Sequence, residues 1–490
     1  MTVSHLVAGP AAAQNTNDPR PVGLGAVLET AVRQSPSLEL ARIDVAIADA
    51  RALEAAGIDD WLLTATAGWL STRAAPVGEF FQTTASDSVE LDVDLERSLP
   101  TGGTFGLHGT GLFRQSTSGL LVDGEFEGDE FEVYRSSVTA RLYQPLLAGR
   151  GRAVARAERR LAEVERTATE LDEIASATLI VRDLVQAYWE LGYAQSDLEI
   201  RESSLELARE RLRITEAGVD AGAVAPSEIL AVQQVMATRE ADVEQAKLNV
   251  TRRSIDLRRL AGMAIGPGEV DVAVAAPAAI DERELPLRDL VARARASSPE
   301  IAVLRARGEG AEIEVEVTEN GLLPRLDATL SFGPRGSSDE LGSTLNQMAT
   351  LDEYQVGATL TYQHALGRRQ ARGAHDAARG RLTRTQIGIA DAELQVSAAV
   401  VEAVRVAETA ARRMEISERA ITLAEQNIEA EVARFELGRS TNFDVLERQD
   451  ELQQAQLRYA RAGVDYVSAL AQLESLTGEL LDAYGITLEL

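Results

Sequence analysis

The sequence predicts a mixed α and β fold, in which long coiled-coil helices accompany a set of short strands. Three observations lead to this prediction. The chain repeats itself in tandem, its long polar segments have a 3.5-residue apolar period, and shorter segments alternate apolar with polar residues. The composition agrees: aromatic residues are only 4% of the 490 residues, and Ala, Leu, Glu and Arg abound, as they do in long helices.

The tandem repeat is clearest in two short turns. Residues 219–233 match residues 435–449 at a constant offset of 216, and residues 24–69 match residues 285–332, including a Ser-Pro pair in each. Between the halves lies a segment with Gly, Pro and few helix formers. We therefore expect a residual signal segment at 1–23, a first structural repeat at 24–262, a linker at 263–284, a second repeat at 285–478 and a tail at 479–490.

Each repeat shows the same order of elements: a helix, strands, a long helix, a turn and a last helix. In the first long helix, Val181, Leu184, Tyr188 and Leu191 are spaced alternately by three and four residues, which indicates helices coiled on one another. The expected helices are 24–57, 150–217 and 227–261 in the first repeat, and 285–320, 368–437 and 442–477 in the second.

The predicted strands alternate cleanly. In "LLTATAGW", Leu63, Ala65, Ala67 and Trp69 share one face, and "RLDATLSF", "YQVGATLTYQ" and "YRSSVTARLY" alternate in the same way. Each run has about the length that a tilted strand needs to cross a bilayer, and aromatic residues lie at the ends of the apolar face, as in an outer-membrane barrel. A soluble sheet with one face on a core would have the same period.

The segments between the strands favour an outer-membrane barrel over a soluble sheet, because long polar loops are expected at 121–131 and 333–354. A further hairpin, 89–99 and 104–113, is joined by "PTGG", and the sequence leaves its place in the sheet open.

Composition excludes several classes of function. The net charge of −28 argues against nucleic-acid binding, and it indicates either simple solubility or an acidic surface that attracts cations. The chain has no cysteine and its four histidines are scattered, so we expect no disulfide, no metal site and no cofactor. Nucleotide-binding and hydrolase motifs are lacking, so an enzyme is not expected. The stretch "GPAAAQ" near the start resembles the end of a clipped secretory signal.

These pieces together resemble the TolC-like outer-membrane efflux proteins of Gram-negative bacteria. The resemblance covers about residues 24–480 and rests on the duplication, on "YQPLLAGRGR" opening the first long helix, and on "LGRSTNFDVLERQ" followed by "DYVSALAQLESLTG". It implies a homotrimer with a periplasmic α-barrel continuous with one shared outer-membrane β-barrel. It also implies the outer component of a tripartite efflux or secretion system, with an inner-membrane transporter and a periplasmic adaptor protein as partners. The rival interpretation is a coiled-coil scaffold without a pore.

By the same resemblance, the two acidic turns are the periplasmic tips of helical hairpins. Asp444 and Glu447 then correspond to acidic residues that ring the closed entrance, with Glu447 where the family more often has aspartate. Three copies would form two stacked carboxylate rings that favour cations. The alternative is that Thr441 and Asp444 only cap a helix.

The resemblance also suggests how the tips are held and what binds them. Glu228 corresponds to an acid that stabilises the closed state, and its basic partner here would be Arg439, because Ser440 stands where the family has arginine. The alternative is a pair of solvated charges. Gly222 and Gly438 should lie where the adaptor contacts the tips, or they simply end helices in a left-handed conformation.

Overall fold

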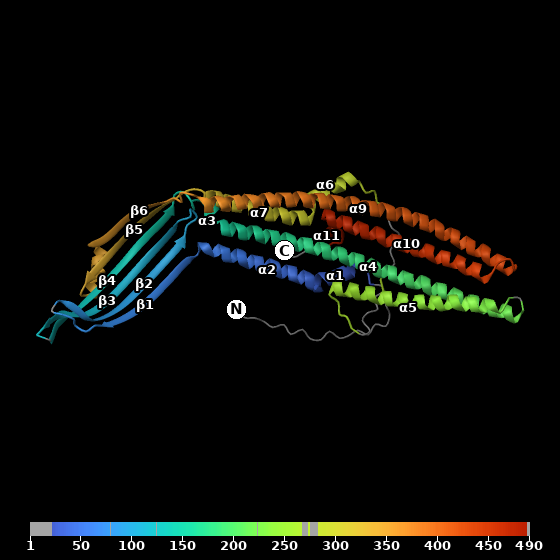
Figure 1. Ribbon diagram of the computed structural model, residues 1–490, viewed down its shortest axis with the longest axis horizontal. Coiled ribbons are helices and arrows are strands. Elements are labelled where there is room, and N and C mark those ends of the chain that lie inside the picture. Colours follow the sequence, from blue (N-terminus) through green and yellow to red (C-terminus); the bar gives the residue numbers. More distant parts are fainter. Residues whose placement is uncertain are drawn as a thin grey trace. The chain divides into compact units, whose positions relative to one another are not determined.

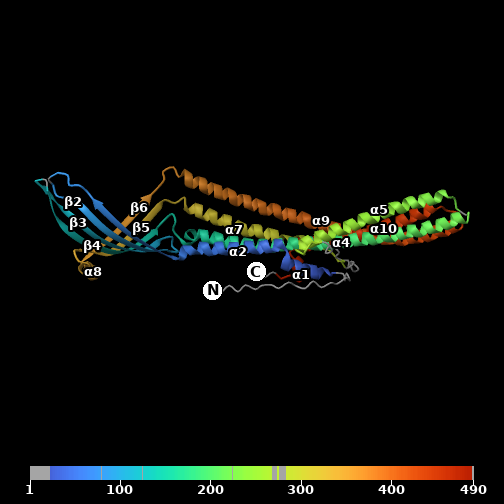
Figure 2. The ribbon, with the colours of Figure 1, turned by 90° about the horizontal axis from the view of Figure 1, so that it is seen from below.

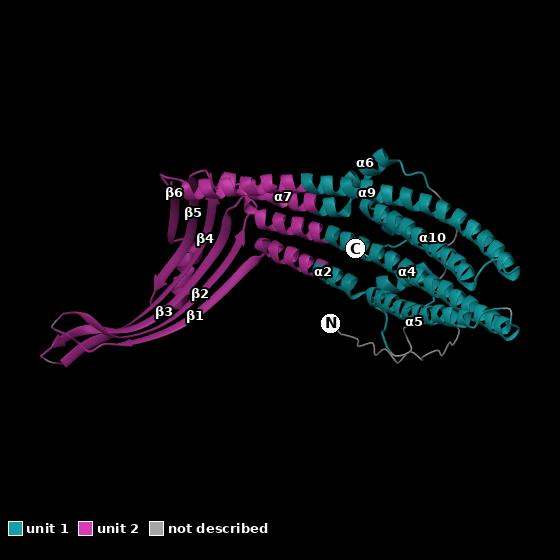
Figure 3. Cartoon of the chain, turned by 45° about the vertical axis from the view of Figure 1, so that its right-hand side comes forward, with its two compact units in different colours: residues 1–44, 170–303, 390–490 teal, residues 45–169, 304–389 magenta. Residues whose placement is uncertain are grey.

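The computed structural model describes most of the chain as two compact units, coloured separately in Figure 3. Unit 1 comprises residues 1–44, 170–303 and 390–490, and unit 2 comprises residues 45–169 and 304–389. The described residues are 22–78, 80–123, 125–222, 224–266, 273–274 and 283–487. The expected signal segment and most of the expected linker lie outside them, and the division into two sequence repeats stays a prediction.

Helices make up most of unit 1, whereas unit 2 combines helices with all six strands of the described chain (Figures 1 and 3). The helices are α1 Leu24–Gln34, α2 Pro36–Ala56, α3 Arg152–Ala155, α4 Ala157–Asp220, α5 Ser227–Ala261, α6 Leu287–Ser297, α7 Pro299–Asn320, α8 Leu341–Thr350, α9 Arg369–Glu436, α10 Asn442–Thr477 and α11 Leu480–Ala483, with the short 3-10 helix η1 Gly57–Asp59. The strands are β1 Trp61–Arg73, β2 Gln82–Ser98, β3 Thr104–Val122, β4 Glu125–Pro145, β5 Arg325–Ser338 and β6 Glu353–Gln363. The two long helices are confirmed, at 64 residues for α4 and 68 for α9.

Each expected first helix is interrupted where the sequence has Ser-Pro. Ser35 separates α1 from α2 and Ser298 separates α6 from α7, with ψ angles of 120° and 125°. The proline ring disfavours the helical conformation of the residue before it, whereas proline itself fits the first position of a helix. The prediction of one uninterrupted helix was therefore wrong at the same place in both repeats.

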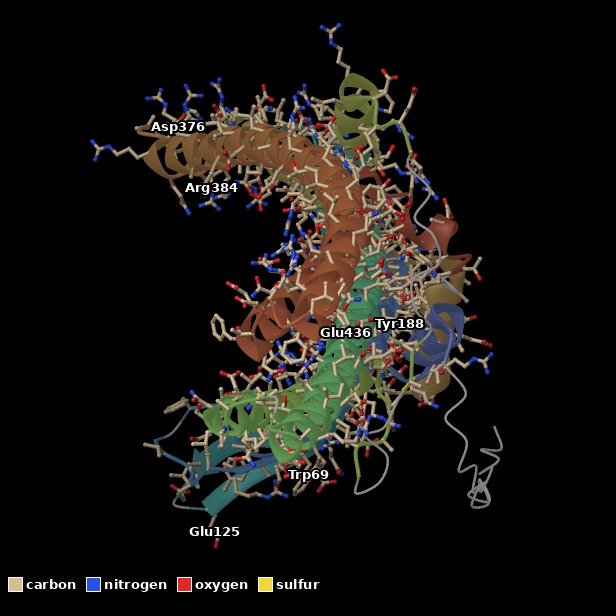
Figure 4. All side chains as sticks on the ribbon, turned by 90° about the vertical axis from the view of Figure 1, so that its right-hand side faces the viewer. Trp69, Glu125, Tyr188, Asp376, Arg384 and Glu436 are labelled. Atoms are coloured by element: carbon tan, nitrogen blue, oxygen red, sulfur yellow. The ribbon has the colours of Figure 1, made fainter. Side chains whose placement is uncertain are left out.

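The apolar core of unit 1 forms around the middle of α4. Val181, Leu184, Tyr188 and Leu191 are almost fully buried against residues of α1, α5, α10 and α11. Each such side chain stabilises the unit by about 1.5–3 kcal/mol relative to exposure. The hydroxyl of Tyr188, labelled in Figure 4, donates to the carbonyl oxygen of Val22 at 2.9 Å. The predicted period of three and four residues is confirmed here.

In each repeat, a glycine at the end of the last helix lies against the end of the first helix. Gly262 ends α5 with φ 70°, and a methyl group added to it would lie 2.2 Å from the carbonyl oxygen of Gln34. Gly478 ends α10 with φ 76°, and a methyl group added to it would lie 2.6 Å from the carbonyl oxygen of Ser297. The duplicated sequence thus repeats the same backbone-to-backbone contact inside unit 1.

Unit 2 contains one antiparallel sheet in the order β1-β2-β3-β4-β5-β6 (Figures 1 and 3). The predicted extra hairpin forms β2 and β3 and lies within the sheet, between β1 and β4. The strand register places apolar residues of neighbouring strands opposite each other. Leu63 pairs with Leu95, Leu95 pairs with Leu107, and Leu107 pairs with Ala140. Apolar residues therefore share one face, as predicted. On that face Trp69, labelled in Figure 4, is 72% exposed.

The two expected polar loops are mostly regular structure. Val122 at the end of β3 pairs with Glu125 at the start of β4, so most of 121–131 is strand. The segment 333–354 holds the end of β5, helix α8 and the start of β6. Both loop predictions were wrong. Polar residues indicate that a segment is exposed to water, but its backbone conformation here is set by pairing with a neighbouring strand. None of the helices in the described ranges combines the length and apolar character that crossing a membrane requires.

The glycine contacts generate a prediction about stability. Gly438 also ends a helix with a positive φ, of 69°, but a methyl group there meets no atom within 4 Å. Gly438→Ala should therefore lose only about 1 kcal/mol for the left-handed backbone. Gly262→Ala and Gly478→Ala should lose roughly a further 1–3 kcal/mol from overlap with a carbonyl. Thermal unfolding followed by circular dichroism should show clearly lower midpoints for the latter two. Equal midpoints for all three variants would contradict the contact.

Candidate functional site at the hairpin tips

Helices α4 and α5 form one hairpin of unit 1, and α9 and α10 form another, each closed by a turn with a left-handed glycine. The φ angles are 71° at Gly222 and 69° at Gly438. At the second turn, the N–H of Gly438 donates to Phe435 and the N–H of Arg439 donates to Arg434, both at 2.9 Å. These bonds satisfy the last carbonyls of α9. Glycine is required by the backbone conformation and not by crowding, because a side chain on either glycine would meet open space.

The second turn begins α10 with a complete capping box. The N–H of Thr441 donates to the Asp444 carboxylate at 2.9 Å, and the N–H of Asp444 donates to the Thr441 hydroxyl at 3.3 Å. Hydroxyls of Thr441 and Ser440 donate to the same carboxylate at 2.8 and 3.2 Å. These bonds, the Thr441 backbone N–H foremost, lower the pKa of Asp444. The cap is confirmed, whereas the gate role of Asp444 stays a prediction. With its lowered pKa, Asp444 is charged at neutral pH.

Glu447 lies one turn further along α10 and is exposed. Its carboxylate lies 3.5 Å from a guanidinium nitrogen of Arg448, which makes a closer contact with Glu451 at 2.7 Å. Since Asp444 and Glu447 are three residues apart, they share one side of the helix. The tip therefore presents two carboxylates in succession, the first held by the helix start and the second largely in solvent.

The first turn lacks this cap. At the offset of 216 residues, Ala225 stands where the second turn has Thr441, so the threonine hydroxyl of the capping box is missing. The backbone N–H of Glu228 donates to the carbonyl of Ala225 at 3.0 Å. Among the described residues of one chain, no ion pair joins half-buried Glu228 to exposed Arg439. The predicted contact between them is not made within one chain's described part and stays a prediction.

Two buried arginines link the hairpins to each other. Arg239 of α5, only 7% exposed, donates to the carbonyl of Ser204 in α4 at 2.7 Å and to the amide oxygen of Gln449 in α10 at 3.4 Å. The guanidinium of Arg211 in α4 lies 5.1 Å from the ring centre of Phe435 in α9. Burial lowers the pKa of both arginines. Sequence reasoning missed these contacts, because nothing local marks partners more than 200 residues apart.

A chain of ion pairs connects the same four helices further from the turns. Glu190 of α4 lies 3.4 Å from Arg253 of α5 and 2.8 Å from Arg461 of α10. Asp465 of α10 lies 2.8 Å from Arg461 and 3.1 Å from Arg413 of α9. The two hairpins are therefore joined at two levels by polar contacts as well as by packing.

Comparison with known proteins identifies relatives of this architecture. The profile of the family described as "Outer membrane efflux protein" matches residues 114–263 and 290–479. The chain is similar in structure to VceC of Vibrio cholerae, with 17% identity, a TM-score of 0.67 and coverage of 93% of this chain and 96% of that one. It is also similar to the CmeC outer membrane channel of Campylobacter jejuni, with 14% identity, a TM-score of 0.67 and coverage of 98% and 94%. The open-state MtrE outer membrane channel of Neisseria gonorrhoeae has 14% identity and a TM-score of 0.64, with coverage of 93% and 89%. No curated protein matches the sequence.

The capping box generates a prediction about pH. Because the folded pKa of Asp444 lies below its ordinary value of about 3.9, its charged form stabilises the start of α10 at neutral pH. That contribution is lost as the pH falls through the folded pKa. Asp444→Asn resembles the protonated acid, so amide hydrogen exchange in residues 442–449 should speed up several-fold at pH 7 but match wild type below the folded pKa.

Asp450→Asn, on the same helix but outside the cap, is the control and should leave this exchange nearly unchanged. An acceleration by Asp444→Asn that is the same at every pH would contradict the assigned role of the charge.

Proposed function

The chain belongs to the outer membrane efflux protein family, and on this premise we propose that it is the outer-membrane channel of a tripartite efflux or secretion system. In this proposal an inner-membrane transporter and a periplasmic adaptor pass substrates to the channel, which carries them to the exterior. The observation that carries the proposal is the sheet of unit 2. One face is apolar and exposed, and β1 and β6 each pair on one side only among the described strands.

The unpaired edges support a homotrimer with one shared barrel. Backbone groups without partners are costly in hydrocarbon, so strands that cross a bilayer must form a closed barrel. With 13 residues in β1 and 11 in β6, both edge strands are long enough to cross. Three copies would contribute 3 × 6 = 18 strands. A barrel of that size leaves an aqueous lumen.

Exposed apolar stripes on two helices support the same assembly. Ile387 and Leu394 lie seven residues apart on α9, and Leu40 and Ile47 lie seven apart on α2, all four with large exposed fractions. This spacing is that of a coiled-coil seam, and the described residues leave these side chains uncovered. Because α2 leads into β1 and α9 follows β6, the helices next to the two edge strands would pack where those strands pair.

The acidic tip fits the entrance of such a channel. In a trimer, Asp444 and Glu447 would form two rings of three carboxylates, which attract cations and repel anions. The hydrogen bonds that lower the pKa of Asp444 favour the charged form of the first ring. Capping and gating are compatible for Asp444, because the side chain can hold the helix start and still contribute its charge to the entrance.

The turns themselves fit contacts between copies and with the adaptor. Glu228 and Arg439, which make no ion pair with each other within one chain's described part, would pair in the closed trimer. Around Gly222 and Gly438, Leu230, Leu437 and Phe443 expose about two-thirds or more of their side chains. Exposed apolar side chains beside a glycine turn suit the docking of an adaptor's helical tips.

The first test is the native mass of the protein extracted with detergent from the outer-membrane fraction of cells that express it with a signal peptide. We expect a trimer of protein mass 3 × 52.7 = 158.1 kDa. Leu394→Glu should weaken the trimer, because it places a charge in the proposed seam. Gln395→Glu, one position along α9, should leave it intact. A monomer or dimer in the soluble fraction would overturn the proposal and favour a coiled-coil scaffold.

Single-channel recording tests the entrance. Asp444→Asn combined with Glu447→Gln should lower the preference for cations over anions and reduce block by divalent cations. The matched control, Glu415→Gln with Glu418→Gln, removes two exposed carboxylates at the same spacing on α9 and should change neither quantity. Arg439→Ala should raise the conductance by releasing the closed tips. Unchanged cation selectivity in the first variant would contradict the acidic gate. Unchanged conductance in Arg439→Ala would contradict the contact between Arg439 and Glu228.

A further inference from the structure

Helix α8 interrupts the connection between β5 and β6 and has two unlike flanks. Leu341 and Leu345, four residues apart, lie on one flank and are each about half exposed. Asn346 and Thr350, also four apart, are exposed on another flank. Between the flanks Thr344 is completely buried. The helix therefore shows a leucine flank and a polar flank to its surroundings at the same time.

Polar contacts fasten α8 to the sheet. The hydroxyl of Thr344 lies 3.3 Å from the carbonyl oxygen of Tyr134 in β4 and 3.0 Å from that of Glu340. The amide oxygen of Gln347 accepts from the N–H of Ser337 in β5 at 2.9 Å. A methyl group on Gly336 would lie 2.1 Å from the carbonyl oxygen of Thr344. The helix backbone thus rests directly on the strand, and Figure 2 shows α8 beside β4 and β5. Its leucine flank is left out of this contact.

Gly336 identifies the face of the sheet that α8 covers. Side chains alternate along a strand, so Gly336 shares a face with Leu330 and Phe332, which belong to the exposed apolar face. Next to the end of α8, the ring of Tyr354 in β6 lies 6.4 Å from the ring of Phe332. The leucine flank of α8 is therefore added to an apolar surface that the sheet already presents.

The end of α8 has a leucine where the other described helix ends of this kind have glycine. Leu351 has φ 59° and closes the helix together with Asp352, whose N–H donates to the carbonyl of Gln347 at 3.1 Å. Gly262 and Gly478 hold the equivalent left-handed position after α5 and α10. A side chain in this conformation costs about 1–2 kcal/mol. In water, the Leu351 side chain does not offset this cost by burial, because about half of it is exposed.

We propose that α8 is a membrane-interface helix. Leu341, Leu345 and Leu351 lie among the acyl chains of membrane lipid, while Asn346 and Thr350 face water. An amphipathic helix held at this depth buries its apolar side in the boundary between headgroups and hydrocarbon. The inference rests on the proposed placing of the sheet's apolar face against lipid. Lipid is the occupant because the leucines continue that face and the opposite flank is polar.

Site-directed spin labelling tests the proposal, because the chain contains no cysteine and any introduced one is unique. Leu345→Cys and Asn346→Cys carry a nitroxide at neighbouring positions on the two flanks. Leu360→Cys and Thr361→Cys are reference positions on the two faces of β6. The labelled full chain is reconstituted in phospholipid vesicles, and power saturation measures collisions with oxygen, which concentrates in lipid, and with a water-soluble nickel chelate.

We expect the Leu345 label to behave like the Leu360 label, with several-fold more collisions with oxygen than with nickel, and the Asn346 label to show the reverse. Equal access of nickel to Leu345 and Asn346, with Leu360 still in lipid, would overturn the proposal for α8 alone. Shielding of Leu345 from both reagents would also overturn it, by indicating that protein covers the flank. Nickel access at Leu360 would overturn the membrane placing of the sheet itself.

Discussion

The backbone groups along β1 and β6 impose the constraint on which the rest of the assembly depends. Inside the sheet each strand satisfies its neighbours, but the two outer strands each leave one row of N–H and C=O groups without a strand partner among the described residues. In water such an edge is a liability, and in hydrocarbon it is prohibitive. In the proposed channel, further copies of the chain close the sheet. The seams on α2 and α9 follow from this, because they continue directly into the edge strands.

In the proposed channel, the helical hairpins of unit 1 meet a different requirement, because its entrance must be able to open. Around Tyr188 the contacts are apolar and tightly buried, and any separation there would expose a large area. Nearer the turns, the contacts between hairpins include Arg239 with Gln449 at 3.4 Å and Arg211 over Phe435. A long hydrogen bond and a cation–π contact lose less on separation than a packed core does, because water can solvate the freed groups.

Much of the fold could be predicted from the sequence, because its signals are periodic and therefore local. The seven-residue spacing placed the long helices, and the bounds of α5 and α10 agree with the expected 227–261 and 442–477. Alternation assigned the faces of every predicted strand. At the candidate site, capping of α10 by Thr441 and Asp444 was the alternative interpretation, and it could be drawn from the sequence because the capping box is encoded within four residues.

What could not be predicted depends on contacts between distant segments. Arg239 and Gln449 are separated by 210 residues, and no local pattern marks a buried arginine as the partner of a buried amide. The acidic stretch after β3 was expected to be a loop, because it is long and polar, yet it pairs residue by residue with β3. Helix α8 escaped notice for the same reason. Its leucines are too few for a core helix, and they form a pattern only once Gly336 brings the helix onto the apolar face of the sheet. The leucine flank of α8 cannot be interpreted from the helix alone. On the sheet, it extends an apolar surface that the strands already present.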